Sequence, residues 1–248
     1  MNVASVGKLG FQLIGTSWGG IRLLQQAITK SARCAVGEQF GSLLAGQLAP
    51  AAEEAAEPVE RAKLRIDRFQ RACWLEAGRN PSFLWGHATL IEQVGSLLAP
   101  PVKGKRAAAD FDALDYFICR QLDVPVVVLL RDGRACIPAK IKNENLPPRA
   151  AVDQWRLSVR AMKRFAFFNE RCAAVRVEDL IAQPKEVMAE VCGLIGVKFE
   201  EAMTEPLVVA QAVDAWGYDP KALARITASE SWNAEIQDDL RDCGYAAA

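Results

Sequence analysis

Residues 13–24 read Leu13-Ile14-Gly15-Thr16-Ser17-Trp18-Gly19-Gly20-Ile21-Arg22-Leu23-Leu24. An apolar run ends there in a glycine-rich turn, and the residues after the turn have the apolar spacing of one helix face. A strand, a tight turn and a helix in this order direct a helix N-terminus and several backbone N–H groups at one point, where proteins bind anions. We therefore predict a phosphate-binding loop. The alternative is a strand-to-helix turn that binds no ligand.

This loop differs from the loop of a nucleotide-binding P-loop protein. The spacing from Gly15 to Gly20 matches the P-loop glycines, but Ile21-Arg22 stands where Lys-Ser/Thr should follow. The missing pair holds the β- and γ-phosphates and Mg²⁺ in a true P-loop. A P-loop kinase or NTPase-like nucleotide-binding protein is therefore kept only as an alternative.

Composition and charge bound the class of protein. The chain has 248 residues, of which 51% are apolar, enough for one large α/β domain. Its 30 basic residues balance its 30 acidic residues, so no net field recruits nucleic acid or an anionic membrane. The seven cysteines form no C-x-x-C pair and there is one histidine, so we predict neither disulfides nor a metal site. No apolar run reaches membrane-spanning length, and we expect a cytoplasmic protein.

Hydrophobic periodicity along the rest of the chain alternates between strand and helix patterns. We predict strands at 11–14, 33–37, 124–130 and 173–177, and helices at 21–28, 59–77, 111–122, 147–170, 185–195 and about 230–243. The pattern at 147–170 is the longest, residues 178–180 are expected to turn the chain, and 82–98 fits either helix or strand. The prediction is a single three-layer α/β domain over residues 1–248, with a central parallel sheet, helices on both faces and a largely helical insertion at about 41–98.

Charged residues follow two of the predicted strands. Arg131 comes directly after the aliphatic run at 124–130, and Glu38 follows the second strand, which ends at Gly37. Open parallel sheets bind ligands outside the carboxyl ends of their strands. Glu38 is expected near the first loop if the first two strands pair in parallel.

Several of these segments, in their order along the chain, resemble motifs of the sulfotransferases that use 3′-phosphoadenosine 5′-phosphosulfate (PAPS). The first loop stands in the frame of P-[KR]-S-G-T-T, which leucines follow. Arg131-Asp132-Gly133-Arg134 is similar to R-D-P-R, and Arg176-Val177-Glu178-Asp179-Leu180 is similar to R-Y-E-D-L. Gln183-Pro184, Leu194-Ile195-Gly196 and Gly37-Glu38 also match segments of that family. The resemblance covers most of the chain.

The resemblance implies that a sulfonate group moves from PAPS to a hydroxyl or amine of a small-molecule or carbohydrate (glycan) acceptor, without a metal. It implies a phosphosulfate-binding loop formed by Ser17, Trp18, Gly19, Gly20, Ile21 and Arg22. It also implies that Arg131 binds the 3′-phosphate, beside Ala139 at the position of a family serine. A salt bridge between Arg131 and Asp132 is the structural alternative.

Two residues are candidates for the general base that removes the acceptor's proton. Members with a matching G-E segment use the carboxylate at the position of Glu38, whereas other branches use a histidine, for which His87 is the candidate. A solvated loop glutamate and a structural histidine are the respective alternatives. Lys103 and Lys105 could bridge the sulfonate oxygens or belong to a solvated basic loop.

The chain departs from the family pattern at the phosphate-binding positions. Trp18 replaces a cation, Ile21 and Arg22 replace two threonines, and Ala139 replaces a serine. Each loss removes a charge-assisted hydrogen bond worth roughly 1.5–3 kcal/mol. The alternative to an enzyme is therefore a degenerate sulfotransferase-fold binding or scaffold protein without PAPS chemistry.

Overall fold

Five parallel strands form the central sheet in the order β2-β3-β1-β4-β5. The computed structural model describes residues 9–37, 58–79, 82–96, 111–121, 123–212, 221, 223, 227–228 and 230–245. The strands are β1 Phe11–Gly15, β2 Cys34–Gly37, β3 Leu84–Leu90, β4 Val126–Leu130 and β5 Cys172–Arg176. β1 is the middle strand, with Ile14 beside Thr89 of β3 and Val128 of β4.

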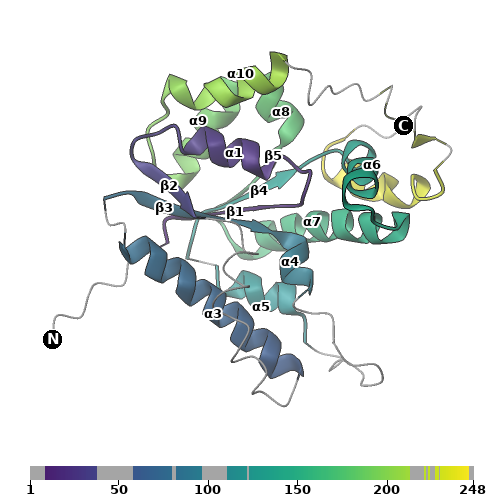
Figure 1. The fold of residues 1–248 in the computed structure, drawn as a ribbon, viewed down its shortest axis with the longest axis horizontal. Helices are drawn as coiled ribbons and strands as arrows, with labels where there is room; N and C mark the ends of the chain where they lie inside the picture. The colour runs from purple at the N-terminus through teal and green to yellow at the C-terminus, as the bar shows by residue number, and fades with distance from the viewer. Residues whose placement is uncertain are drawn as a thin grey trace.

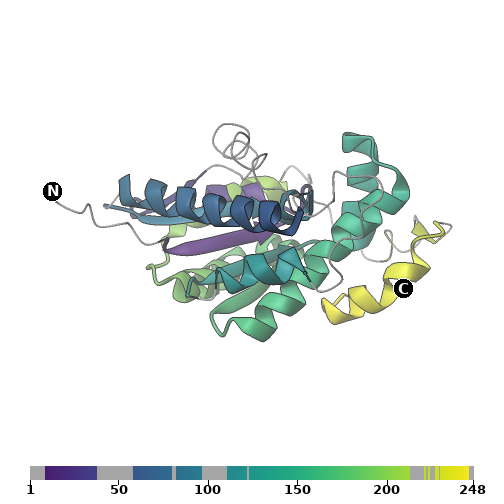
Figure 2. The same ribbon diagram turned by 90° about the horizontal axis from the view of Figure 1, so that it is seen from below.

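Helices cover both faces of this sheet and complete three layers (Figures 1 and 2). One face carries α1 Ile21–Ile28, α8 Val177–Ala182, α9 Pro184–Ile195, the 3₁₀ turn η2 Glu201–Thr204 and α10 Glu205–Ala212. The other carries α3 Pro58–Arg79, α4 Ile91–Ser96, α5 Ala113–Cys119 and α7 Pro148–Phe168. At the carboxyl edge of the sheet lie α6 Gly133–Glu144, η3 Ala234–Ile236 and α12 Gln237–Asp242 (Figure 1).

Each face of the sheet packs against its own hydrophobic core. Alternate residues of β4 show why: Val126 and Val128 belong to the core under α3, α5 and α7, whereas Val127 and Leu129 belong to the core under α1 and α9. All five residues of β4 are buried. A strand buried on both faces reads as a continuous aliphatic run, and this confirms the parallel three-layer α/β class.

Most predicted elements occur close to their expected bounds. The strand at 11–14 and the helices at 21–28 and 59–77 correspond to β1, α1 and α3. The helix at 185–195 corresponds to α9, and Gly196 ends it in the left-handed conformation with φ 80°. The helix predicted at 147–170 is α7, but α3 with 22 residues is one residue longer than α7.

Three predictions need correction. The undecided range 82–98 contains β3, which lies between β2 and β1, so this part of the expected insertion at about 41–98 belongs to the sheet. Residues 178–180 lie in α8 instead of a turn, because the acidic side chains of Glu178 and Asp179 suit the first turn of a helix. The final helix predicted at 230–243 is divided into η3 and the short α12.

The position of β3 also changes the expected neighbourhood of Glu38. β2 pairs with β3 and not with β1, so Gly37 ends a strand two positions away from the first loop. Neighbouring strands are about 4.8 Å apart, which separates the axes of β2 and β1 by roughly 10 Å. Glu38 itself lies outside the described residues, and its role stays a prediction.

The backbone at Gly20 accepts only glycine. Its φ is 88°, and a Cβ atom there would lie 2.3 Å from Cγ2 of Val177. We predict that Gly20→Ala lowers the free energy of unfolding by about 2–4 kcal/mol, from the left-handed conformation and the overlap together. Gly193→Ala is the matched control, because nothing lies within 4 Å of a Cβ at this exposed helical position. It should raise stability by about 0.5–1 kcal/mol in urea unfolding. Equal effects of the two changes would contradict this account.

Candidate functional site

The loop between β1 and α1 leaves the N-terminus of α1 uncapped. The N–H of Gly19 donates to the carbonyl of Thr16 at 2.9 Å and closes a tight turn. Trp18, with φ 62°, and Gly20 both adopt the left-handed conformation. Gly20 is the N-cap residue of α1 and makes no side-chain capping hydrogen bond. The first N–H groups of a helix have no intrahelical partner, so this N-terminus can accept an anion.

A buried ion pair lies against the loop. Lys140 of α6 is fully buried, and its Nζ donates to Glu92 Oε1 of α4 at 3.0 Å. The same ammonium donates to Gln154 Oε1 at 2.9 Å and to the Ser17 hydroxyl. Glu92 Oε1 also accepts the backbone N–H of Ser17 at 2.6 Å and the hydroxyl of Thr16 at 3.3 Å. The conformation of the loop is thus fixed by side chains from α4, α6 and α7.

Arg131 joins the carboxyl end of β4 to the same loop. Its Nη1 donates to the carbonyl oxygen of Trp18 at 2.9 Å, and its own carbonyl accepts the indole N–H of Trp155 at 2.9 Å. Asp132, its partner in the structural alternative, forms an ion pair with Arg134, with 2.6 Å between Nη2 and Oδ2. The geometry therefore places the guanidinium of Arg131 beside the candidate anion site.

The segment 131–134 and the segment 176–180 contact each other outside the pocket. Fully buried Asp132 caps α6 by accepting the N–H of Arg134 at 2.8 Å. Its own N–H donates to Glu178 Oε1 at 3.0 Å, and the Tyr245 hydroxyl donates to Glu178 Oε2 at 2.8 Å. Burial raises the pKa of the Glu178 carboxyl above its usual range. These residues hold β4, α6 and α8 together and do not border the pocket described next.

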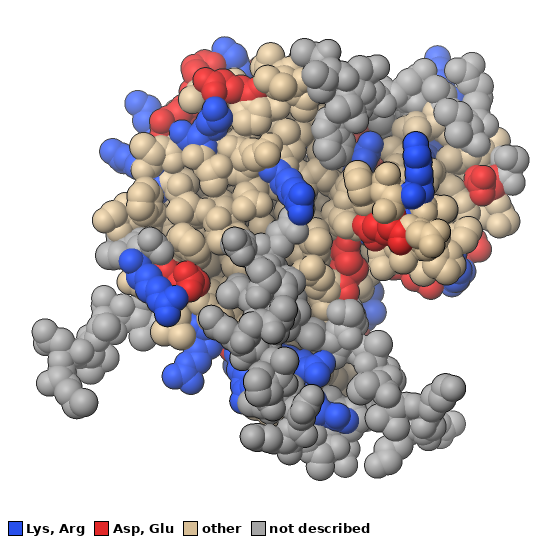
Figure 3. All heavy atoms as spheres, viewed as in Figure 1, with Lys and Arg blue, Asp and Glu red and all other residues tan. Residues whose placement is uncertain are grey.

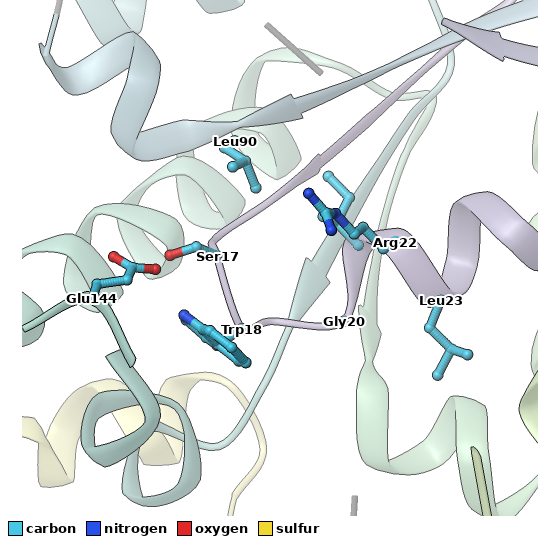
Figure 4. A pocket seen from close by; sticks show the side chains of 8 residues that line it. Ser17, Trp18, Gly20, Arg22, Leu23, Leu90 and Glu144 are labelled. Atoms are coloured by element: carbon cyan, nitrogen blue, oxygen red, sulfur yellow. The ribbon is translucent and has the colours of Figure 1, made fainter. Parts of the chain in front are cut away.

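A pocket of about 360 Å³ opens beside the loop (Figure 4). Small-molecule sites commonly measure about 300–1,000 Å³. Its lining consists of Ser17, Trp18, Gly20, Ile21, Arg22, Leu23, Leu90 and Glu144. Apolar side chains dominate this lining. In Figure 4 the carboxylate of Glu144, at the end of α6, points toward Ser17. The Trp18 side chain is 43% exposed.

The surface charge of the described residues is mixed on one face of the molecule (Figure 3). On the face seen in Figure 3, Lys and Arg side chains are interspersed with Asp and Glu over the described residues. Within the described ranges, no group of three or more His, Cys, Asp or Glu side chains is arranged to hold a metal ion. The described helices include none that is long and apolar enough to cross a membrane.

The structure brings most of the predicted loop residues together. Ser17, Trp18, Gly20, Ile21 and Arg22 line the pocket, while Gly19 is buried within the turn.

The other candidates are distributed differently. Ala139 is half-buried in α6, directly before Lys140, and does not line the pocket. His87 is 1% exposed within β3; its ring packs edge-on against Phe69, and its Nδ1 lies 3.3 Å from the Thr89 hydroxyl. The buried ring does not border the pocket. Glu38, Lys103 and Lys105 lie outside the described residues.

Sequence reasoning missed the residues that support the loop, Glu92, Lys140 and Gln154. Glu92 follows β3 by two residues, and recognising that strand would have placed its carboxylate at the ligand-binding edge of the sheet. Nothing in the sequence marks Lys140, because lysines are almost always exposed and its burial depends on the path of α6.

The fold is that of sulfotransferase domains. The sulfotransferase domain of the Synechococcus PCC 7002 olefin synthase matches with a TM-score of 0.56 at 18% identity, over 94% of this chain and 93% of that domain. The sulfotransferase domain of the curacin biosynthetic pathway matches with a TM-score of 0.54 at 16% identity, over 98% of this chain and 100% of that domain. No protein-family model matches the sequence, and no curated protein sequence does. At these identities the likeness concerns the fold.

The raised pKa of Glu178 has a consequence for stability. When folding raises the pKa of a carboxyl, protonation of that carboxyl stabilises the folded state. This contribution is complete at pH values below the pKa in the unfolded chain. It is lost as pH rises through the pKa in the folded protein. We predict that Glu178→Gln gains stability relative to the unsubstituted protein as pH rises above about 4, the usual pKa of a glutamate in an unfolded chain. The hydrogen bond that the substitution removes changes the free energy of unfolding by the same amount at every pH. Urea unfolding of both proteins should therefore be measured at several pH values, and the trend of the stability difference with pH should be compared. A stability difference that stays constant or falls with rising pH would contradict the raised pKa of the Glu178 carboxyl.

Proposed function

We propose that this chain is a cytoplasmic PAPS-dependent sulfotransferase that moves a sulfonate group to a hydroxyl or amine of an acceptor molecule. The observation that carries the proposal is the meeting of three groups at the carboxyl edge of the sheet: the uncapped N-terminus of α1, the hydroxyl of Ser17 and the guanidinium of Arg131. The sulfotransferase fold supports it. All seven cysteines are free, which supports a reducing compartment.

In this proposal the protein aligns the reacting groups and neutralises negative charge. The N–H groups of Ile21 and Arg22 bind the 5′-phosphosulfate at the helix N-terminus, where the helix dipole favours an anion. Arg131 binds the 3′-phosphate and stays tied to the loop through the carbonyl of Trp18. PAPS supplies the sulfonate and leaves as the bisphosphate. Lys103 and Lys105 remain candidates for contacts with the sulfonate oxygens.

Glu38 and His87 remain the candidates for the general base. A base must come within hydrogen-bond reach of the proton that it removes, directly or through one water. The 1% exposure of His87 and its absence from the pocket lining weigh against it. Glu38 is therefore the preferred base in this proposal.

The residues of the loop fit the co-substrate in part. The side chain of Ile21 is only 3% exposed, so it packs in the core instead of replacing a threonine hydroxyl. Trp18 contributes an exposed aromatic surface where the family has a cation, and Ala139 offers no hydroxyl. The described part of the chain supplies Arg22 and Arg131 in compensation. The apolar lining formed by Trp18 and Leu90 favours a small-molecule acceptor with a hydrocarbon portion over a carbohydrate.

A second candidate function is a sulfotransferase-fold binding protein without transfer activity. The observation that favours it is the Glu92 carboxylate, which already accepts the N–H of Ser17 at 2.6 Å. That N–H is therefore not available to a phosphosulfate. A P-loop kinase or NTPase is the third candidate. It ranks last because Ile21-Arg22 stands where a P-loop has its Lys-Ser/Thr pair.

Calorimetry with adenosine 3′,5′-bisphosphate and with Mg·ATP separates these candidates. We predict that the bisphosphate binds in preference to Mg·ATP, and that Arg131→Ala weakens its binding roughly 10- to 100-fold, since a charged hydrogen bond is lost. Arg79→Ala is the matched control, because exposed Arg79 precedes the amino end of β3 at the opposite edge of the sheet. Preferential binding of Mg·ATP would contradict the proposal. Binding of neither nucleotide would contradict it as well and would favour the binding protein without transfer activity.

A further inference from the structure

The loop lacks the cation that its family frame provides, yet a fully buried cation contacts it from behind. Lys140 is 0% exposed, and its side chain extends from α6 to the hydroxyl of Ser17. Burying an ammonium ion is unfavourable unless it is paired and hydrogen-bonded. Its partners are Ser17, Glu92 and Gln154, which together accept all three of its protons.

The direction of the hydrogen bond to Ser17 determines what Ser17 can do. An ammonium group only donates, so the Ser17 oxygen accepts in this bond. A serine hydroxyl has one proton of its own, and that proton is left to point elsewhere. Ser17 lines the pocket, and in Figure 4 the carboxylate of Glu144 points toward it. A bound anion can take the place of this exposed glutamate.

The counter-ion lies away from the pocket. Glu92 is held by Lys140, Thr16 and the backbone N–H of Ser17, and it is not among the lining residues. The Lys140 ammonium therefore polarises the hydroxyl of Ser17, and Ser17 lines the pocket. Because Lys140 is fully buried and the side chain of Glu92 is only 12% exposed, salt screens this pair much less than it screens a surface pair.

We propose that Lys140, acting through the hydroxyl of Ser17, is the cation that holds the anionic end of the ligand in this pocket, with Glu92 as its buried counter-ion. Lys140 is thus a positioning residue, and Ser17 is the group that contacts the anion. The identity of the anion as a phosphosulfate rests on the proposed function, whereas the anion site itself does not require a nucleotide.

The same contacts argue against a serine nucleophile in the sequence Gly15-Thr16-Ser17-Trp18-Gly19. That chemistry requires a neutral amine with a lone pair to accept the Ser17 proton. Lys140 faces the Glu92 carboxylate at 3.0 Å, and an ammonium in that pair has no lone pair to offer. Ser17 therefore acts as a hydrogen-bond donor.

The decisive experiment compares Lys140→Met with Glu92→Gln. Both changes break the buried pair and should lower stability, but they leave opposite charges behind. Lys140→Met should weaken binding of adenosine 3′,5′-bisphosphate and of inorganic sulfate at least about tenfold, and Glu92→Gln should strengthen both about three- to tenfold. A purely structural role predicts that both variants bind more weakly, and that result would overturn the proposal.

Matched variants isolate the charge and the hydroxyl. Lys163→Met and Glu190→Gln make the same changes at exposed positions of α7 and α9, and should alter affinity less than about twofold. Ser17→Ala should weaken binding roughly 10- to 100-fold, whereas Ser17→Thr, which keeps the hydroxyl, should stay within about threefold. If Lys140→Met does not fold, the double variant with Glu92→Gln removes both charges and should still bind both probes more weakly than the unsubstituted protein.

The two probes distinguish this proposal from the proposed function. Binding of sulfate with these variant effects, but not of the bisphosphate, would support the anion site and contradict the PAPS enzyme. If the bisphosphate binds tightly and Lys140→Met and Ser17→Ala change its affinity by less than about threefold, the role of Lys140 is overturned. The proposed PAPS enzyme is not contradicted by that result. Binding of neither probe overturns both proposals. Covalent labelling of Ser17 by a fluorophosphonate would overturn its assignment as a donor.

Discussion

The contact between Lys140 and Glu92 is the constraint on which the site depends. Glu92 follows β3, Ser17 follows β1 and Lys140 belongs to the helix after β4, and these are three neighbouring strands. One ion pair therefore ties together the segments that leave the sheet at its carboxyl edge. Without it, the loop would lose both its carboxylate acceptor and the donor that orients Ser17. The position of the pocket follows from this bond and from the parallel order of the strands.

Charge at this edge is balanced locally. Asp132 is paired with Arg134 and Glu92 with Lys140, and both pairs are buried or nearly so. Such pairs contribute little net stability compared with well-packed apolar residues, but removing one partner alone is costly. Their value is that they fix geometry: the first caps α6, and the second shapes the loop. Because the chain has zero formal net charge, the proposed anion site depends on a few oriented groups and not on a net field of the whole protein.

The sequence was informative where local physics decides the structure. The glycines of the first loop, the aliphatic run before Arg131 and the glycine at 196 each report a backbone or burial requirement of their own segment. β3 was not recognisable, because Gly86, His87 and Thr89 interrupt its apolar pattern; Gly86 is required where the ring of Phe11 packs against the strand. Lys140 and Glu92 were missed for a related reason, since their pairing depends on how α4 and α6 pack around the loop. Tertiary contacts of this kind leave no periodic signal in a single sequence.

The most direct measurement of the central claim is a crystal structure with adenosine 3′,5′-bisphosphate bound. We expect the 5′-phosphate at the N-terminus of α1, at about 2.7–3.2 Å from the N–H of Ile21 and from the hydroxyl of Ser17, with Lys140 and Glu92 still paired behind the loop. A nucleotide bound elsewhere on the sheet, or a phosphate that contacts neither group, would contradict it.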